Sequence, residues 1–510
     1  MSKYTRWMTF LILCTATAGK AEIAVQDEPL VINSGEAEYN GKEISLTGNV
    51  VIQHSLGKIA AQHLTILPSE DKKMRFAFIK MDEDIRIDLQ GGGQLNCQQA
   101  EIDYQHLKGV FQGNAQAPDV VYIEMGNSSD TPDQAVLMVK SEKLDAELQQ
   151  QLNPVTSTTQ TVIKQLQAIG NIRAYYNNNY LILADHAHYQ RLPTEQDPLA
   201  QTLTLSTVNP KDCLCQITNK NGDLLQAERI QIKMPNRQLI CFQPRGTLVF
   251  NQKEKPQQIE FAATTLTWDD PEQKLLLQGQ IQMHQAGVGD LKANKEVTIQ
   301  QHIVQGQKAI HSISSKEGAE LSYIDPYQMT HHLINYGPLL INHEKMQVIL
   351  HSPINEQGEI PVEKQIHFEN LFCDAYANQM QIDYKEQEQM WTPVKIILQG
   401  QVKILNRFDG HIQETGSILH YVLADHIEYF PETQDLLLSS QEGKRVLFYD
   451  KVNNVQMSAA SLKIKRDPQT HKESIQGIGD VRFTFIEHEF DQFKEHFRLE
   501  DKNPIKNKSN

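Results

Sequence analysis

The sequence lacks the features of several large protein classes. Beyond its N-terminal segment it has no apolar run long enough to cross a bilayer as a helix. It is also poor in positive charge, with 48 Lys and Arg against 63 Asp and Glu and a net charge of −15 at pH 7. Such a chain repels nucleic-acid phosphates. Because 40% of its residues are hydrophobic, we still expect a folded protein.

Motifs of common enzymes are missing too. The chain contains no G-x-S-x-G, no P-loop and no H-E-x-x-H, and His488-Glu489 lacks the second histidine at the required offset. We therefore predict no enzyme, no catalytic residue, no cofactor and no metal site. A carbohydrate-active β-helix enzyme with dispersed carboxylates stays a less favoured alternative, because strict rungs of about 20 to 25 residues are not evident.

Cysteines are few. Five follow the N-terminal segment, at Cys97, Cys213, Cys215, Cys241 and Cys373. The spacing of Cys213 and Cys215 fits neither a redox C-x-x-C nor a zinc pair. A bridge from Cys241 to one of these two is compatible with an oxidising compartment, and the odd number leaves at least one thiol unpaired.

The N-terminal segment has the pattern of a signal peptide. Lys3 and Arg6 precede a short apolar stretch, residues 7–14, and Ala16-Thr17-Ala18 offers a cleavage site, with Ala21 as a second choice. We predict a signal peptide over residues 1–21 and export from the cytoplasm. A buried N-terminal strand is the alternative.

The clearest internal signal is a repeat centred on glycine, Φ-x-Φ-x-G-x-Φ-x-Φ, where Φ is apolar. Alternation at period two is typical of a strand with one apolar face. The glycine falls on that face, where it either leaves a gap in the side-chain layer or lets the strand bend sharply. Three copies are clear: Ile44, Leu46, Gly48, Val50 and Ile52; Leu275, Leu277, Gly279, Ile281 and Met283; Ile396, Leu398, Gly400, Val402 and Ile404. Looser copies surround Gly113, Gly170, Gly246, Gly337 and Gly479.

A second pattern lies between these copies. The stretch from Leu183 to Tyr189, L-A-D-H-A-H-Y, is nearly repeated from Leu423 to Tyr429 as L-A-D-H-I-E-Y. Its histidines and aspartate suggest a metal site, but the second copy lacks the second histidine. A half-exposed strand is the better interpretation. The uneven glycine spacing predicts divergent β units rather than a strict short-period solenoid.

Helix is scarce in the pattern. Ser141 to Leu152 has leucines at helical spacing, although strand pairing can override so short a segment. Residues 486–498 place Ile486, Phe490, Phe493 and Phe497 on one helical face. Prolines and polar linkers suggest borders near 190 and 350. We predict a first lobe over 22–190, a second over 191–350, a third over 351–485, and a C-terminal helix and tail over 486–510.

The first repeat with its flanks resembles the OstA-like module. This stretch reads I-N-S-G-E-A-E-Y from Ile32, I-S-L-T-G-N-V-V-I from Ile44 and I-A-A-Q-H-L from Ile59. Later G-N steps at Gly113 and Gly170 are weaker, and Gly279 and Gly400 are followed by glutamine. The module belongs to the LptA family of periplasmic lipopolysaccharide-transport proteins and also forms the N-terminal domain of LptD. The chain departs from that family in its length and has no evident outer-membrane barrel.

The resemblance implies an all-β fold of tandem OstA-like β-jelly-roll modules in an elongated twisted trough. The pattern of residues 486–498 adds a short C-terminal helix, which either caps the last sheet or docks a partner. It implies a periplasmic bridge that shields lipopolysaccharide acyl chains between the inner and outer membranes. Its partners would be a lipid A-type glycolipid and other jelly-roll transport proteins, joined through edge strands. The candidate lining residues are Ile44, Leu46, Val50, Ile52, Leu275, Leu277, Ile281, Ile396, Leu398, Val402 and Ile404. An envelope scaffold that carries no lipid is the main alternative.

Overall fold

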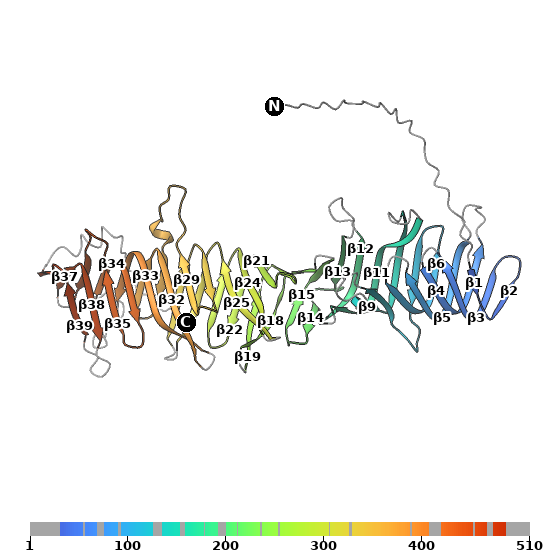
Figure 1. Ribbon diagram of the computed structural model, residues 1–510, viewed down its shortest axis with the longest axis horizontal. Coiled ribbons are helices and arrows are strands. Elements are labelled where there is room, and N and C mark those ends of the chain that lie inside the picture. Colours follow the sequence, from blue (N-terminus) through green and yellow to red (C-terminus); the bar gives the residue numbers. More distant parts are fainter. Residues whose placement is uncertain are drawn as a thin grey trace, which may run out of the picture.

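The described chain is almost entirely β structure. The computed structural model describes residues 31–485 except for 55–56, 69–75, 90–92, 126–134, 153–158, 178, 192–199, 212, 235–236, 253–254, 305–306, 326–328, 388–389, 407–419, 452–453 and 467–472. Within these residues the chain forms one antiparallel sheet of 40 strands. The strands lie across the long axis of an elongated molecule, and the chain proceeds from one end to the other (Figure 1). No helix in the described part could span a membrane.

The first third contains β1 to β12. Their bounds are β1 Val31–Asn33, β2 Glu36–Tyr39, β3 Ile44–His54, β4 Gly57–Pro68, β5 Phe76–Leu89, β6 Gln94–Asp103, β7 Lys108–Gln112, β8 Val120–Met125, β9 Ala135–Ser141, β10 Lys143–Leu152, β11 Thr159–Tyr176 and β12 Tyr180–Arg191.

The middle contains shorter strands. They are β13 Gln201–Ser206, β14 Cys215–Asn219, β15 Leu224–Ala227, β16 Arg229–Met234, β17 Gln238–Phe242, β18 Arg245–Gln252, β19 Lys255–Ala262, β20 Thr265–Asp269, β21 Lys274–Gln278, β22 Ile281–Gln285, β23 Gly289–Ala293, β24 Glu296–Val304, β25 Gln307–Ser315, β26 Ala319–Ile324, β27 Thr330–Asn335, β28 Leu339–Asn342 and β29 Gln347–His351.

A short 3₁₀ helix, η1 Val362–Lys364, precedes the last strands. These are β30 Ile366–Glu369, β31 Cys373–Ala377, β32 Gln379–Gln387, β33 Met390–Asn406, β34 His420–Phe430, β35 Asp435–Ser439, β36 Val446–Asp450, β37 Val455–Ala459, β38 Ser461–Arg466, β39 Glu473–Ile478 and β40 Arg482–Phe485.

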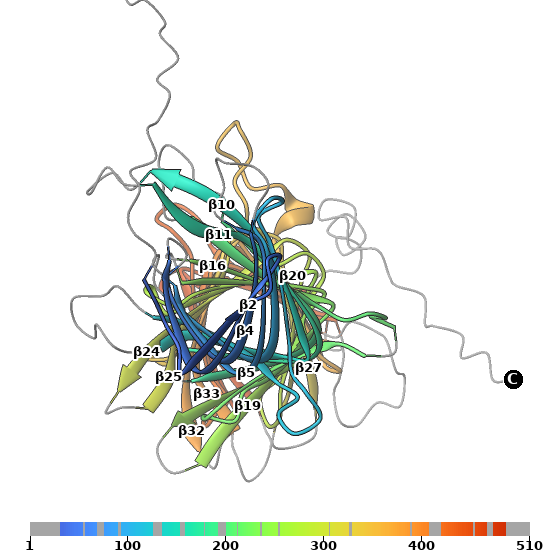
Figure 2. The ribbon, with the colours of Figure 1, turned by 90° about the vertical axis from the view of Figure 1, so that its right-hand side faces the viewer.

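The pairings form two rows that run the length of the described chain. Row A begins with β2 and ends with β39; row B begins with β1 and ends with β40. Eight strands belong to both rows, each by one half: β3, β4, β5, β6, β11, β12, β33 and β34. Between β16 and β31 the chain instead lays hairpins in rows A and B alternately. Viewed along the long axis, successive strands fan out at different angles (Figure 2), as sheet twist requires.

The repeated glycines mark bends where the chain passes from row A to row B, except Gly337, which lies between β27 of row B and β28 of row A. In β3, residues up to Thr47 pair in row A and residues from Val50 pair in row B. At the bend Gly48 has a φ of 78° and Asn49 one of 48°. Gly170 with Asn171 and Gly400 with Gln401 repeat this left-handed pair. Glycine accepts such a backbone without strain, so the structure shows a bend, not a gap in the side-chain layer, as the role of these glycines.

Returns from row B to row A have their own pattern, a small buried residue followed by a polar one. The Asp185 carboxylate accepts a hydrogen bond from the backbone N–H of Val208 at 3.0 Å, and Asp425 accepts one from Gln441 at 3.0 Å. The aspartates of the second sequence pattern therefore hold neighbouring bends together. The small residues at these returns are Ala61, Cys97, Ser141, Ala184, Ala227, Ala263, Ala293, Ala377, Ala424 and Ala459, and all but Ala459 precede a polar residue.

Two predictions meet the structure here. The leucine-spaced segment is β10 and no helix, because a spacing of four residues also keeps Leu144 and Leu148 on one face of a strand. Rows A and B continue through residues 190 and 350, since β12 pairs with β13 and β29 pairs with β32. Division into three lobes stays a prediction. The predicted signal peptide and C-terminal helix lie outside the described residues.

Candidate functional site: the apolar interior and its rims

Inward side chains of the two rows share one buried apolar cluster. It extends from Leu46 in β3 to Ile464 in β38 and contains residues of both rows at successive strands. The side chains of a strand point alternately to its two faces, so every second residue points inward. A bent strand therefore contributes inward residues to row A from one half and to row B from the other. The interior is therefore continuous along the described chain, and it is the largest feature on which a function can be built.

Every predicted lining residue lies in or against this cluster. Eight are buried, and three are half-buried and pack on the cluster, namely Ile44, Ile396 and Ile404. The eight buried ones are Leu46, Val50, Ile52, Leu275, Leu277, Ile281, Leu398 and Val402. The alternation in the sequence thus predicted the inward face correctly. Whether these side chains contact a lipid is a separate question.

The interior is filled closely by the protein's own side chains. Ile52, Ile59 and Leu277 have no exposed surface. A cavity between β8, β9 and β12, next to Tyr122 and Tyr189, has a volume of about 10 Å³. That is room for about one water molecule. In this conformation an acyl chain would need the two rows to move apart there.

The side of the molecule opposite the bends is formed by hairpin turns, here called rim A and rim B after their rows. The two rims meet through side chains. In the middle of the molecule Gln257 of rim B donates to the Glu386 carboxylate of rim A at 2.6 Å. Tyr323 of rim B donates its hydroxyl to the Trp391 carbonyl of rim A at 2.8 Å. These contacts are non-covalent, whereas the bends are continuous backbone.

One rim contact is an ion pair shielded from water. Lys308 Nζ lies 2.8 Å from Asp223 Oδ2, and both side chains are about one-seventh exposed, at 13% and 14%. Asp223 also accepts from the Val249 N–H at 2.7 Å and from the Asn219 side-chain amide. The ammonium lies 5.0 Å from the Phe250 ring centroid. The carboxylate is thus held by rim B while the cation comes from rim A.

In the first third, aromatic rings meet across the interior. The ring centroids of Tyr122 in β8 and Tyr189 in β12 are 6.2 Å apart. The Tyr122 hydroxyl donates to Glu124 at 3.1 Å. Burial raises the pKa of Glu124, while this hydrogen bond and the charge of Arg191 lower it in part. A half-buried carboxyl of row B and a half-buried guanidinium of row A therefore accompany the apolar interior in the first third.

The outermost strands have free edges in the described part of the chain. At one end β1 and β2 pair only with β3, and at the other β39 pairs with β38 and β40 with β37. Apolar side chains lie exposed on these strands: Tyr39 is 65% exposed, Ile478 51% and Phe483 57%. Unpaired edges of this kind accept further strands.

Thiol pairing does not stabilise this interior. Cys241 forms no disulfide, and neither does Cys213 or Cys215, so the bridge from Cys241 to one of these two is not formed. Burial raises the pKa of Cys97 and of Cys215 to about 12. Cys241 is buried as well and behaves as a small apolar residue of the interior.

No protein-family model matches the sequence, and no curated protein matches it.

The rim contacts are the main feature that sequence reasoning missed. Lys308 and Asp223 are 85 residues apart, and Gln257 and Glu386 are 129 apart. No pattern of nearby residues can predict contacts over such separations. The return bends had a readable signal, because eight of the ten small residues precede Asp, Asn, Gln or Glu. In the sequence this signal stands out at Ala184 and Ala424, because the residues that flank these two alanines also match each other.

Proposed function

We propose that the protein is a lipid-carrying bridge of the bacterial envelope, exported to the periplasm, and that its two rows are the walls of a twisted trough built from tandem OstA-like β-jelly-roll modules. The observation that carries the proposal is the continuous apolar interior between two rows joined by backbone on one side only. With 24 strands in each row at about 4.8 Å spacing, the trough is about 110 Å long.

The physical need for such a trough comes from lipid hydration. Each CH₂ exposed to water costs about 0.8 kcal/mol, so one long acyl chain costs on the order of 10 kcal/mol. Side chains such as Leu46 and Leu277 would replace that water. Since the described interior is filled, the rims must separate to admit a chain, and their polar contacts are the ones that can break and re-form.

Free edges at the two ends fit a bridge. Strand addition at β2 or β39 would extend row A into a neighbouring jelly-roll protein without interrupting the interior. The exposed Tyr39 and Ile478 would be covered in such a joint. Lipopolysaccharide or a related lipid A-type glycolipid is the proposed cargo, and no catalytic residue or cofactor is required.

Photocrosslinking in living cells tests the proposal. A photoreactive amino acid is placed singly at Leu46, Leu277 and Leu398, which are buried. Matched controls are the exposed neighbours Thr47, Gln278 and Gln399. We expect glycolipid adducts at the inner positions and none at the controls. Adducts without face preference would contradict the lipid interior.

A scaffold that binds envelope proteins is the second candidate, and the filled interior favours it. In the same experiment it predicts protein adducts at Thr47 or at the edge residue Tyr39, and no lipid adduct at any inner position. A rim-locked variant separates the two further. Asp223→Cys and Lys308→Cys, joined by a short bifunctional thiol reagent in a background free of other cysteines, should abolish lipid adducts at Leu277 and leave scaffold contacts intact.

A further inference from the structure

The hairpin of β30 and β31, which belongs to rim B, has three side chains on its outer face that can bind a metal ion. Ile366 of β30 and Ala375 of β31 face the apolar interior. Because side chains alternate along a strand, His367, Glu369 and Asp374 point to the opposite face. One ligand atom from each of these three side chains lies within 4.8 Å of the other two. Among the residues that the structure describes, no other three side chains of this kind come so close together.

The register of this hairpin holds the three side chains together. Glu369 and Asp374 are direct partners across the two strands, and His367 lies two residues before Glu369 on the same face. The turn that joins the strands is tight, because the side-chain carbonyl of Asn370 accepts a hydrogen bond from the backbone N–H of Cys373 at 2.8 Å. All three side chains thus come from one hairpin, and their spacing does not depend on contacts between distant parts of the chain.

The distances between the ligand atoms fit one shared ion. His367 Nε2 lies 3.2 Å from Asp374 Oδ1. Zinc bonds of about 2.0–2.1 Å in a tetrahedral arrangement place two ligand atoms of one ion about 3.4 Å apart. The His367 ring stacks flat on Tyr376, with ring centroids 4.5 Å apart and an interplanar angle of 1°, and this contact fixes the direction of Nε2. Glu369 is half-buried, and rotation of its longer side chain closes the remaining distance.

The charges of the hairpin favour a cation at this position. The carboxylates of Glu369 and Asp374 lie directly opposite each other, and like charges in that arrangement destabilise a strand pair. Although it is on the outer face, the side chain of Asp374 is only 1% exposed, so water screens its charge poorly. A divalent cation bound to both carboxylates would replace their repulsion with attraction.

We propose that His367, Glu369 and Asp374 bind one Zn²⁺ ion on the outer face of rim B, with a water molecule at the fourth position. Imidazole and carboxylate are both zinc ligands, whereas Mg²⁺ and Ca²⁺ prefer oxygen ligands alone. The prediction of no metal site rested in part on the lack of H-E-x-x-H, and here the ligands instead come from two paired strands. The ion would stabilise the hairpin by mass action, independently of lipid carriage.

The test is titration of the tag-free, chelator-treated full-length mature protein with Zn²⁺ by calorimetry. We expect one ion per chain. Binding should be about 100-fold weaker or more in His367→Gln and in Glu369→Gln, because loss of a ligand should exceed the roughly 10-fold to 100-fold effect of losing a residue behind a ligand. Urea unfolding in chelator checks that both variants are folded. Zn²⁺ should raise the urea midpoint of the parent protein and leave the midpoints of the two variants unchanged.

The matched control is His284→Gln. His284 and Asp290 also face each other across a hairpin, that of β22 and β23, with Nδ1 2.8 Å from Oδ1. Within the described residues no third ligand atom joins this pair. A histidine and a carboxylate on paired strands are therefore present without the complete site, and this variant should bind Zn²⁺ like the parent.

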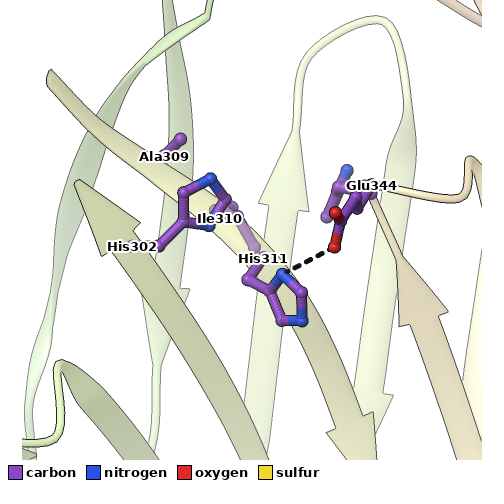
Figure 3. A pocket seen from close by; sticks show the side chains of 6 residues that line it. His302, Ala309, Ile310, His311 and Glu344 are labelled. Carbon is purple, nitrogen blue, oxygen red and sulfur yellow. Dashed lines mark ion pairs between the residues drawn. The ribbon is translucent and has the colours of Figure 1, made fainter. Parts of the chain in front are cut away.

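A second control comes from a pocket of about 360 Å³ between turns of rim A. Figure 3 shows His302, His311 and Glu344 around this pocket, and its complete lining is His302, Ala309, Ile310, His311, His343 and Glu344. A register shift between Gln300 and Gln301 makes His311 an extra residue in β25 and turns it toward the pocket. In the part of the chain that the structure describes, no three ligand atoms of this pocket lie within 4.8 Å of one another, so His302→Gln should also bind Zn²⁺ like the parent.

Parental affinity in a folded His367→Gln or a folded Glu369→Gln would overturn the proposal. Loss of binding in His284→Gln or in His302→Gln, or no binding by the parent protein, would do the same. None of these results bears on glycolipid adducts at Leu46 or Leu277, so failure of the zinc site and failure of the proposed function are distinguishable.

Discussion

The two sides of the molecule are constructed differently. On the bend side the link between rows A and B is continuous backbone, repeated at left-handed glycines and at small buried residues. On the rim side the link is made by side chains that differ from turn to turn, such as Lys308 with Asp223 and Tyr323 with Trp391. The bend side therefore fixes the architecture, and the rim side is the one that can be tuned or opened.

The largest effect is expected from crowding a bend. Gly318, between β25 and β26, has a φ of 89°, and a Cβ there would lie 2.7 Å from the Asn335 carbonyl oxygen. Gly318→Ala should lower the free energy of unfolding by about 4 kcal/mol, measured from urea unfolding. Gly443→Ala is the control, because Gly443 has a φ of 83° with nothing within 4 Å. It should cost only about 1 kcal/mol. If the two substitutions lowered the free energy of unfolding equally, the close approach of the backbone at Gly318 would not be what stabilises that bend.

Acidification should act through rim A. His343 has its pKa lowered from 6.5 to about 4 in the folded protein. Between these values the unfolded chain binds more protons, so the stability contributed by neutral His343 is complete above pH 6.5 and is lost as the pH falls toward 4. The loss amounts to roughly 3 kcal/mol at most. His343→Gln should flatten the fall of the urea midpoint over this range. If the His343→Gln variant kept the pH profile of the parent protein, His343 would not be the group whose protonation destabilises the fold.

The smallest effect concerns a single contact between the rims. A double-mutant cycle with Lys308→Met and Asp223→Asn should give a coupling of about 1–2 kcal/mol, because water is largely excluded from the pair. The comparison cycle uses Lys80 and Glu101, 3.2 Å apart with side chains 55% and 49% exposed. It should give well under about 1 kcal/mol. If both cycles gave the same value, the rim pair would be an ordinary surface contact.

The features that could be predicted from the sequence are those set by a few consecutive residues. Alternation around Gly48, Gly279 and Gly400 reveals both the strands and their inward face, because period two and a tolerant backbone are properties of a few consecutive residues. The same pattern could not separate a bend from a gap, since both call for glycine on the apolar face. The dihedral angles at Gly48 and Asn49 decide this question.

The rest depends on which strands become neighbours. His302 and His343 are 41 residues apart and share a pocket only because β24, β25 and β28 are consecutive in row A. The extra residue in β25 that turns His311 is likewise set by pairing. The sequence separation between such neighbours depends on the lengths of the turns between their strands, and these lengths vary widely in this protein.

The alternating hairpins divide the length of the molecule into nearly equal steps. Strands β16, β20, β24 and β28 begin at residues 229, 265, 296 and 339, and each interval adds two strands to each row. Since strands are about 4.8 Å apart, one such interval lengthens the rod by about 10 Å. Duplication or loss of a segment between two equivalent bends would change the reach of the protein in steps of that size and leave the cross-section of its interior unaltered. The distance that the protein spans can thus evolve separately from whatever its interior binds.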